Sequence, residues 1–314
     1  MTILRLASYN IQYGMGKDGR FDLARIAADL GCSANASPDS PLGPNSSFGP
    51  DIIALQEVER FCARSGMVDQ AEALSALLPH LHWVYGPGID VDASTVLDGR
   101  ILRRRRQYGN MVMSRWPILS AVTHPLPKLG LTNIFHQQRC LVETVIATPA
   151  GALRFCSVHL DNVAPETRMP QVQLMMELAL NGAIRGGNWG GESAARRFEQ
   201  PEPPMPADVV IMGDMNFNTE SGEYDRVIGE RSQWHGRMVL SGGLADAWVA
   251  AGHDEASGDT IPHPDPGVGP RRIDHCFLSA RLAPFVTAAR IGVEAQGSDH
   301  QPVFFDLDVP GPLR

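Results

Sequence analysis

The sequence predicts an α/β fold in which mixed β-sheets are covered by helices on their outer faces. Short β-rich runs recur along the whole chain, and several are continuously apolar, as in strands buried beneath helices. Helical segments lie between some of these runs. Other successive strands are too close in sequence for a helical crossover, which favours an α/β sandwich with mixed sheets over a doubly wound parallel sheet.

The expected elements follow from these patterns in chain order. Strands are expected at Ile3–Asn10, Asp51–Gln56, Gly109–Ser114, Leu141–Thr148, Leu153–His159, Val209–Gly213, Ile273–Leu278 and Val303–Leu307. Helices are expected where apolar residues recur three and four positions apart, over Phe21–Leu30, Ser65–Leu78 and Met169–Ala183.

Three stretches rich in Gly, Pro and small polar residues interrupt the pattern, at Gly31–Pro50, Gly186–Ala207 and His253–Pro270. Such composition is typical of loops and of domain linkers. Motifs of one kind of chemistry lie on both sides of each stretch. We therefore interpret all three as loop insertions in one domain that spans residues 1–314.

Composition excludes several classes of protein. The net charge of −8 argues against a protein that binds nucleic acid through a broad basic surface. The five cysteines form no CxxC pair, which indicates reduced, mostly buried thiols rather than a zinc-thiolate site or a disulfide framework. The chain shows no apolar leader and no apolar window of transmembrane length, so a cytoplasmic location is expected.

Polar side chains recur at the ends of the expected strands, where a rigid scaffold would hold them in a site. They are Asn10, Glu57, His159, Asp214, Asn216, Asp274, Asp299 and His300. Carboxylate and amide oxygens suit Mg²⁺ or Mn²⁺ better than zinc. Together with two histidines, they fit metal-assisted attack of water on phosphorus.

Each of these residues has a simpler structural interpretation when taken alone. An Asp at the end of a strand is commonly a turn or helix cap, and a single His is commonly a hydrogen-bonded structural residue. The joint arrangement is what favours the catalytic interpretation.

These segments resemble the motifs of the endonuclease/exonuclease/phosphatase superfamily, which includes deoxyribonucleases, apurinic endonucleases, neutral sphingomyelinases and inositol-polyphosphate 5-phosphatases. The similar segments occur in the family's order and cover nearly the whole chain. They are Ser8–Ile11, Leu55–Val58, Tyr108–Met111, Ser157–Leu160, Gly213–Asn216, Arg272–His275 and Gly297–His300.

The resemblance implies a four-layer sandwich of two packed mixed β-sheets flanked by α-helices. It also implies that Glu57 is the principal metal carboxylate, with Asn10 and Asp299 near the same cation. His300 would be the base that activates water, oriented by Asp274, a pairing that also suits the chemistry of an imidazole base.

The resemblance assigns further roles on the substrate side of the site. Asp214 would position or deprotonate the water, Asn216 would hold a phosphate oxygen, and His159 would donate to the phosphate. Arg139 and Asn110 would bind substrate. Gln12 stands where apurinic endonucleases carry an acidic residue, and His159 stands where they carry Tyr. Gln12 argues against the apurinic endonuclease branch, and His159 is closer to the deoxyribonuclease and sphingomyelinase branches.

The run Arg100–Arg106 is the main clue to the substrate. It is either an ordinary solvated loop or a basic lip that grips phosphates of nucleic acid, of an inositol polyphosphate or of an anionic lipid surface. The leading hypothesis is a Mg²⁺- or Mn²⁺-dependent phosphodiesterase or phosphatase acting on a small phosphorylated metabolite or a lipid headgroup.

Three alternatives remain beside this hypothesis. The first is a nuclease that grips DNA or RNA through Arg103–Arg106. The second is a catalytically inactive binding module, against which the intact set of site residues argues. The third is a metal hydrolase of other bonds, for which the sequence offers no HExxH motif or histidine cluster.

Overall fold

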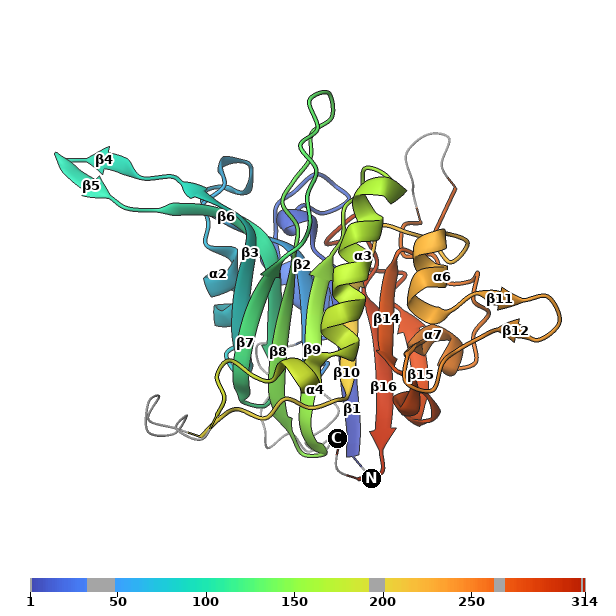
Figure 1. Cartoon of the computed structure of the whole chain (residues 1–314). Coiled ribbons are helices and arrows are strands. Elements are labelled where there is room, and N and C mark those ends of the chain that lie inside the picture. The colour runs from blue at the N-terminus through green and yellow to red at the C-terminus, as the bar shows by residue number, and fades with distance from the viewer. Residues whose placement is uncertain (1, 33–48, 192–200, 263–268, 312, 314) are drawn as a thin grey trace.

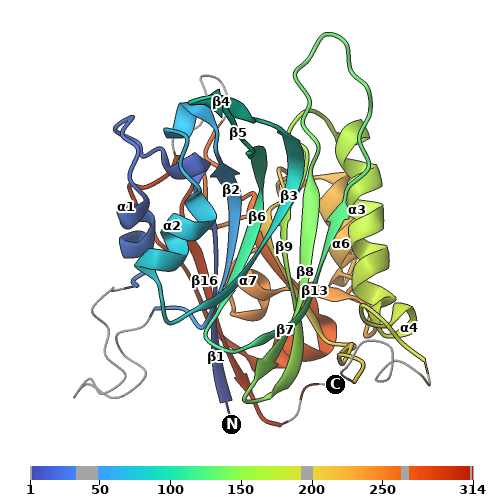
Figure 2. The same ribbon diagram turned by 90° about the vertical axis from the view of Figure 1, so that its left-hand side faces the viewer.

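Two six-stranded mixed sheets pack face to face in the computed structural model, and helices cover their outer faces (Figures 1 and 2). The structure describes residues 2–32, 49–191, 201–262, 269–311 and 313. The predicted α/β sandwich with mixed sheets and flanking helices is therefore confirmed.

The first sheet contains both ends of the chain's β-structure. Its strand order is β15 (Val286–Ile291), β16 (Val303–Val309), β1 (Thr2–Asn10), β2 (Ile52–Arg60), β6 (Arg105–Ser114) and β3 (His82–Asp92). Only the β1–β2 pair in this order is parallel, and the other neighbours are antiparallel.

The second sheet repeats this arrangement. Its order is β13 (Leu244–Asp246), β14 (Asp274–Ser279), β10 (Val209–Asp214), β9 (Gly151–His159), β8 (Cys140–Thr148) and β7 (Ile118–Pro125). The β9–β10 pair is parallel and the others are antiparallel. Two small ribbons lie outside both sheets, β4 (Thr95–Leu97) with β5 (Arg100–Leu102) and β11 (Arg231–Ser232) with β12 (Gly236–Arg237).

The helices lie on the outer faces. The first sheet is covered by α1 (Leu23–Asp29) and α2 (Gln70–Leu77), and the second by α3 (Pro165–Leu180) and α6 (Gly222–Ile228) (Figure 2). The other short helices in the described residues are α4 (Gly182–Arg185), α7 (Ala247–Ala250), η1 (Gln12–Gly14), η2 (Ala63–Ser65) and η3 (Ala280–Phe285). No helix in the described ranges is long and apolar enough to cross a membrane.

The three predicted helices are present with shifted ends. Asp22 caps α1 by accepting hydrogen bonds from the backbone of Ala24 and Arg25, which starts that helix two residues later than expected. Asp69 caps α2 in the same way and delays its start to Gln70. The third helix, α3, begins earlier than predicted because Pro165 is suited to the first helical position.

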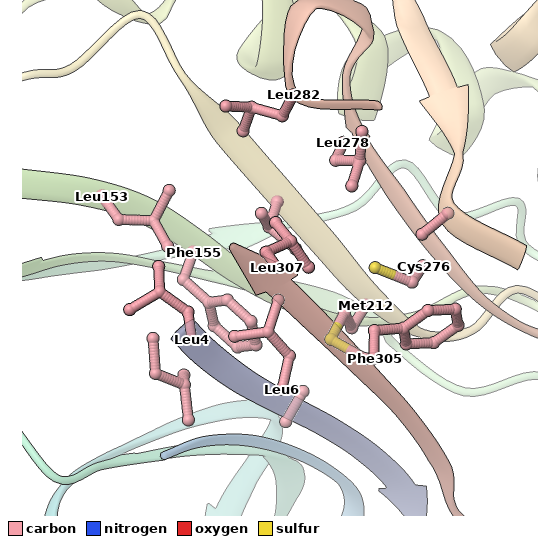
Figure 3. Packing of buried hydrophobic residues seen from close by; sticks show 14 of the residues in the cluster. Leu4, Leu6, Leu153, Phe155, Met212, Cys276, Leu278, Leu282, Phe305 and Leu307 are labelled. Carbon is pink, nitrogen blue, oxygen red and sulfur yellow. The ribbon is translucent and has the colours of Figure 1, made fainter. Parts of the chain in front are cut away.

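The side chains of each inner strand alternate between two apolar layers, as the two-residue period of a strand requires. On β1, Leu4 and Leu6 face the second sheet, whereas Ala7 and Tyr9 pack against α1 and α2. Figure 3 shows Leu4 and Leu6 among buried side chains from both sheets, including Phe155, Met212 and Phe305. Burial on both faces explains why the inner strands read as continuous apolar runs.

Two expectations about loops need correction or restriction. The run Arg100–Arg106 is not simply a loop, because Arg100–Leu102 form β5 and β6 begins at Arg105. The centres of the three expected loop insertions, at residues 33–48, 192–200 and 263–268, lie outside the described residues.

All five cysteines are free, and four of them are buried, in agreement with reduced thiols.

Candidate active site

The topology brings the predicted site residues to one end of the sandwich. The parallel pairs β1–β2 and β9–β10 run toward the same edge of the sandwich, which places Asn10, His159 and Asp214 at strand ends there and Glu57 beside Asn10 within β2. The antiparallel strand β14 starts at that edge with Asp274, directly opposite Asp214. The strand register alone therefore assembles most of the candidate site.

Asp214 is the centre of this hydrogen-bonded group. Its Oδ2 accepts a hydrogen bond from Asn10 Nδ2 at 3.0 Å and lies 3.2 Å from His159 Nε2 and 3.6 Å from His300 Nε2. Its Oδ1 accepts from the backbone N–H of Asn216 at 2.9 Å. Burial opposes its charge, but His159, His300 and Asn10 hold the pKa of Asp214 well below its usual range. The carboxylate stays ionised.

His300 is held between two carboxylates. Its Nδ1 lies 2.8 Å from Asp274 Oδ2, so the opposite nitrogen, Nε2, faces Asp214 and Asn10. Burial disfavours the imidazolium, yet Asp274 and Asp214 raise the pKa of His300 to about 10. Burial also raises the pKa of Asp274. Of the two groups we assign the proton to His300, because Asp214 stabilises a positive charge there and destabilises a negative charge on Asp274.

A serine turn fixes His300 and Asp299 at this edge. Ser298 Oγ donates to the backbone oxygen of Asn10 at 2.7 Å and accepts from the N–H of His300 at 3.2 Å. Gly297 packs so closely here that an added Cβ would lie 2.6 Å from Asp29 Oδ2. The turn thus joins the last strand of the first sheet to the end of β1.

Glu57 is aimed into the site by a β-bulge. The register between β2 and β6 shifts between Leu55 and Val58, and Glu57 has a φ of 58°, in the left-handed region. Non-glycine residues seldom adopt this conformation, which is typical of functional sites. Asn10 Nδ2 lies 3.3 Å from Glu57 Oε1 and holds its carboxylate toward Asp214.

Glu57 and Asp299 are the carboxylates available for a cation. Reduced hydration and then the negative charge of Glu57 raise the pKa of Asp299, a repulsion that a bound cation would relieve. The two hard oxygen donors fit Mg²⁺ or Mn²⁺. Within the described residues no three His, Cys, Asp or Glu side chains form a ready-made metal site. Asn10 turns its amide nitrogen, not its oxygen, toward Glu57, and its oxygen accepts from Gln12 N–H.

Arg139 forms a buried cationic group beside these residues. Its Nη1 donates to Tyr108 Oη and to His159 Nδ1, both at 3.1 Å, and its Nε has no hydrogen-bond partner among the described residues. Because His159 Nδ1 accepts from Arg139, His159 Nε2 carries the proton and donates to Asp214. An unpaired buried guanidinium N–H is well suited to bind an anionic oxygen.

The two predicted asparagines differ in their surroundings. Asn216 is partly exposed, has a φ of 53°, and donates to the backbone oxygen of Leu160 at 3.0 Å. Asn110 is buried, and its Nδ2 donates to the backbone oxygens of Cys140 and Ser157 at 2.9 and 3.3 Å. With both amide hydrogens used to join the two sheets, Asn110 does not have the donor expected of a phosphate ligand.

Tyr108 belongs to the site but was missed by sequence reasoning. It shares a strand face with Asn110, and its hydroxyl contacts Arg139. Burial and the nearby charge of Glu57 raise the pKa of Tyr108 well above its usual value, so the phenol keeps its proton. The signal was present in the segment Tyr108–Met111, where the aromatic residue two positions before Asn110 points the same way.

The packed sheets with this Asp–His site at one edge define a phosphoesterase fold. The model of the endonuclease/exonuclease/phosphatase family matches residues 7–300, and the chain belongs to that family of hydrolases. The expected family resemblance is thereby confirmed. No curated protein matches the sequence.

Solved structures of similar fold cover almost the whole chain. An endonuclease/exonuclease/phosphatase protein from Beutenbergia cavernae is 22% identical, with a TM-score of 0.62 over 98% of this chain and 72% of its own. The mannosyl-6-phosphatase Bt3783 of Bacteroides thetaiotaomicron is 18% identical, with a TM-score of 0.56 over 97% and 99%. Humanized D. rerio TDP2 is 16% identical, with a TM-score of 0.54 over 98% and 99%.

Proposed function

We propose that this protein is a divalent-cation-dependent phosphoester hydrolase, a phosphodiesterase or phosphatase. The observation that carries the proposal is the chain of contacts from Asp274 through His300 to Asp214, set beside the carboxylate of Glu57. It combines a proton acceptor, carboxylates that stabilise its charged form, and donors for a cation.

Hydrolysis joins the oxygen of water to phosphorus and breaks the bond from phosphorus to the ester oxygen, which leaves as an alcohol. Nε2 of His300 and Oδ2 of Asp214 lie 3.6 Å apart, at the edge where water would bind. His300 carries a proton in the structure without a cation, and the positive charge of a divalent cation at Glu57 and Asp299 would lower its pKa. Nε2 of His300 could then take a proton from water, and Asp274 on the opposite side of the ring would stabilise the imidazolium that forms. Asn216 and Arg139 lie where they can hold non-bridging phosphate oxygens.

Glu57 and Asp299 would hold a Mg²⁺ or Mn²⁺ ion, and Asn10 would orient Glu57. The cation would neutralise charge on the phosphate oxygens as the new bond forms. Arg139 adds a fixed positive charge to the same task, because its neighbours Tyr108 and His159 hold the guanidinium in place.

The test is a panel of phosphoesters with Mg²⁺, Mn²⁺ or EDTA. It contains a nitrophenyl diester, a nitrophenyl monoester, glycerophospholipid headgroups and plasmid DNA. We expect EDTA-sensitive hydrolysis of a small phosphoester or a headgroup. Nicking of plasmid alone would instead support a nuclease. No EDTA-sensitive turnover of any substrate would overturn the proposal and leave an inactive binding module or a hydrolase of other bonds.

Variants separate the catalytic assignment from folding. His300→Ala and Asp214→Asn should each lower turnover by a factor of about 10² to 10⁴, the range for loss of a general base. His82→Ala, which removes an exposed histidine on β3, is the matched control and should retain activity. Normal turnover by well-folded His300→Ala would reject His300 as the base.

A further inference from the structure

The hairpin of β4 and β5 extends away from the body of the protein beyond the edge of the first sheet (Figure 1). Val96 pairs with Ile101 across the two strands, and Asp98 and Gly99 form a tight turn with positive φ. Val96, Leu97 and Ile101 are 72%, 61% and 67% exposed. A short ribbon with three exposed aliphatic side chains is unusual in a protein that meets only water.

Arginines lie beside and behind this apolar tip, with Arg100 paired to Leu97 next to the turn and Arg103 following β5. Residues 90–106 contain five arginines and three aspartates, a net charge of +2 on a chain whose net charge is −8. Arg105 pairs with Asp90 at 2.8 Å and Arg104 stacks on Phe61. Arg100 and Arg103 are exposed, and neither has a salt-bridge partner within the described part of the chain. Two positive groups are therefore free to meet an anionic surface.

A second apolar projection lies at the same end of the sandwich. The segment between β7 and β8 rises above the sheets (Figures 1 and 2). Its Leu129, Ile134 and Phe135 side chains are exposed. Phe135 also lines a cleft of about 270 Å³ with Tyr108 and Arg106. This segment ends at Arg139 of the candidate site, and the hairpin leads through β6 to Tyr108. Both apolar projections are thus joined by short chain segments to residues of the candidate site.

We propose that the β4–β5 hairpin docks the protein on an anionic lipid surface. Val96, Leu97 and Ile101 enter the interfacial region, and Arg100 and Arg103 lie against lipid phosphates. The binding partner is a membrane rather than a nucleic acid because the tip is aliphatic. Proteins that bind single-stranded nucleic acid instead present aromatic side chains that stack on the bases. The inference rests on the proposed function, because docking would bring the phosphoesters of lipid headgroups to the candidate site.

Vesicle sedimentation without substrate tests docking separately from hydrolysis. The protein is mixed at about 0.15 M salt with phosphatidylcholine vesicles, with or without phosphatidylserine. We expect binding to the anionic vesicles and little binding to the neutral ones. Val96→Ser/Leu97→Ser/Ile101→Ser should weaken binding by tenfold or more, through the loss of buried apolar surface. Arg100→Gln/Arg103→Gln should weaken it by about 30-fold.

The matched control replaces exposed apolar residues elsewhere, Ile184→Ser/Trp234→Ser, which are 87% and 79% exposed. It should bind vesicles like the unmodified protein, and circular dichroism should show all variants folded. No binding to anionic vesicles, or equal binding by the tip variant, would overturn the proposal. Salt-sensitive binding to duplex DNA that survives the tip substitutions but not the arginine substitutions would also overturn it. Failure of the docking tests would leave the proposed hydrolase activity standing, because hydrolysis of soluble phosphoesters depends on the candidate site alone.

Discussion

Glu57 combines a functional carboxylate with a backbone conformation that disfavours its side chain. Its φ of 58° follows from the bulge that turns it away from the ladder between β2 and β6. Without the bulge, a side chain at this position would follow the ordinary alternation of the strand. Strain at this residue is therefore coupled to the geometry of the candidate site.

This coupling predicts that two variants with the same loss of activity differ in stability. Glu57→Gly and Glu57→Ala should both be inactive, but Glu57→Gly should be more stable than Glu57→Ala by about 1 kcal/mol, because glycine accepts positive φ. Both variants lose the same charge, so their difference isolates the backbone. Urea unfolding measures it, and equal stabilities would show that the bulge does not strain the folded protein.

His275, the neighbour of Asp274, is a buried structural histidine. Its Nδ1 accepts from Arg272 at 3.1 Å and its Nε2 donates to the backbone oxygen of Phe217 at 3.0 Å. Burial and then the charge of Arg272 lower the pKa of His275 to about 4. The neutral ring is the form that the folded protein accommodates.

Acid should therefore destabilise the protein through His275. The unfolded chain binds a proton below its ordinary pKa of 6.5, whereas the folded protein resists protonation down to about 4. Stability thus falls as the pH drops from 6.5 toward 4, and the loss between pH 7 and pH 5 should be about 2 kcal/mol. His275→Gln should lose less stability than the unmodified protein over this interval. An equal loss in both would exclude His275 as the cause.

At the scale of elements, the packing of β10 against β9 explains why glycine occupies position 213, at the start of the segment Gly213–Asn216. Strand β10 approaches β9 so closely that a Cβ on Gly213 would lie 1.8 Å from the backbone oxygen of Val158. The next residue is Asp214, so any displacement of β10 would also move the centre of the site.

Gly213→Ala should lower the free energy of unfolding by at least about 2 kcal/mol and reduce hydrolysis. The matched control is Gly222→Ala at the start of α6, where an added Cβ would meet nothing within 4 Å. That variant should unfold at nearly the same urea concentration as the unmodified protein. Similar behaviour of the two variants would contradict the close approach of β10 to β9.

The expected strands illustrate which elements a sequence pattern can find. The eight predicted strands correspond to β1, β2, β6 and β16 of the first sheet and to β8, β9, β10 and β14 of the second. These are the inner strands. The edge strands β3, β7, β13 and β15 were not predicted. β3 contains Pro87, which an edge strand tolerates at the register shift between Pro87 and Ile89.

At the scale of the whole molecule, cation binding should couple to folding, because the proposed ligands come from opposite ends of the chain. Glu57 lies on β2 and Asp299 precedes β16, so only the folded chain brings them together. The net charge of −8 further favours binding of a cation.

Mg²⁺ should therefore raise the free energy of unfolding by about 2.7 kcal/mol at one hundred times its Kd. Thermal unfolding with increasing Mg²⁺ measures this shift, and EDTA should reverse it. The same titration of Glu57→Ala is the control and should show little change. Stabilisation by Mg²⁺ that persists without Glu57 would assign the cation to another site.

The sequence by itself determined the inner strands and the family, and it predicted most residues of the candidate site. Those features are local, because a strand buried on both faces must be apolar along its length and a motif is read from neighbouring residues. The tertiary structure decided what depends on neighbours distant in sequence. It placed Asp214 between His159 and His300, assigned Asn110 to the contact between the sheets, and added Tyr108 to the site. It also showed that the arginine run is part of an exposed apolar hairpin, because strand pairing and exposure depend on which chain segments meet in space.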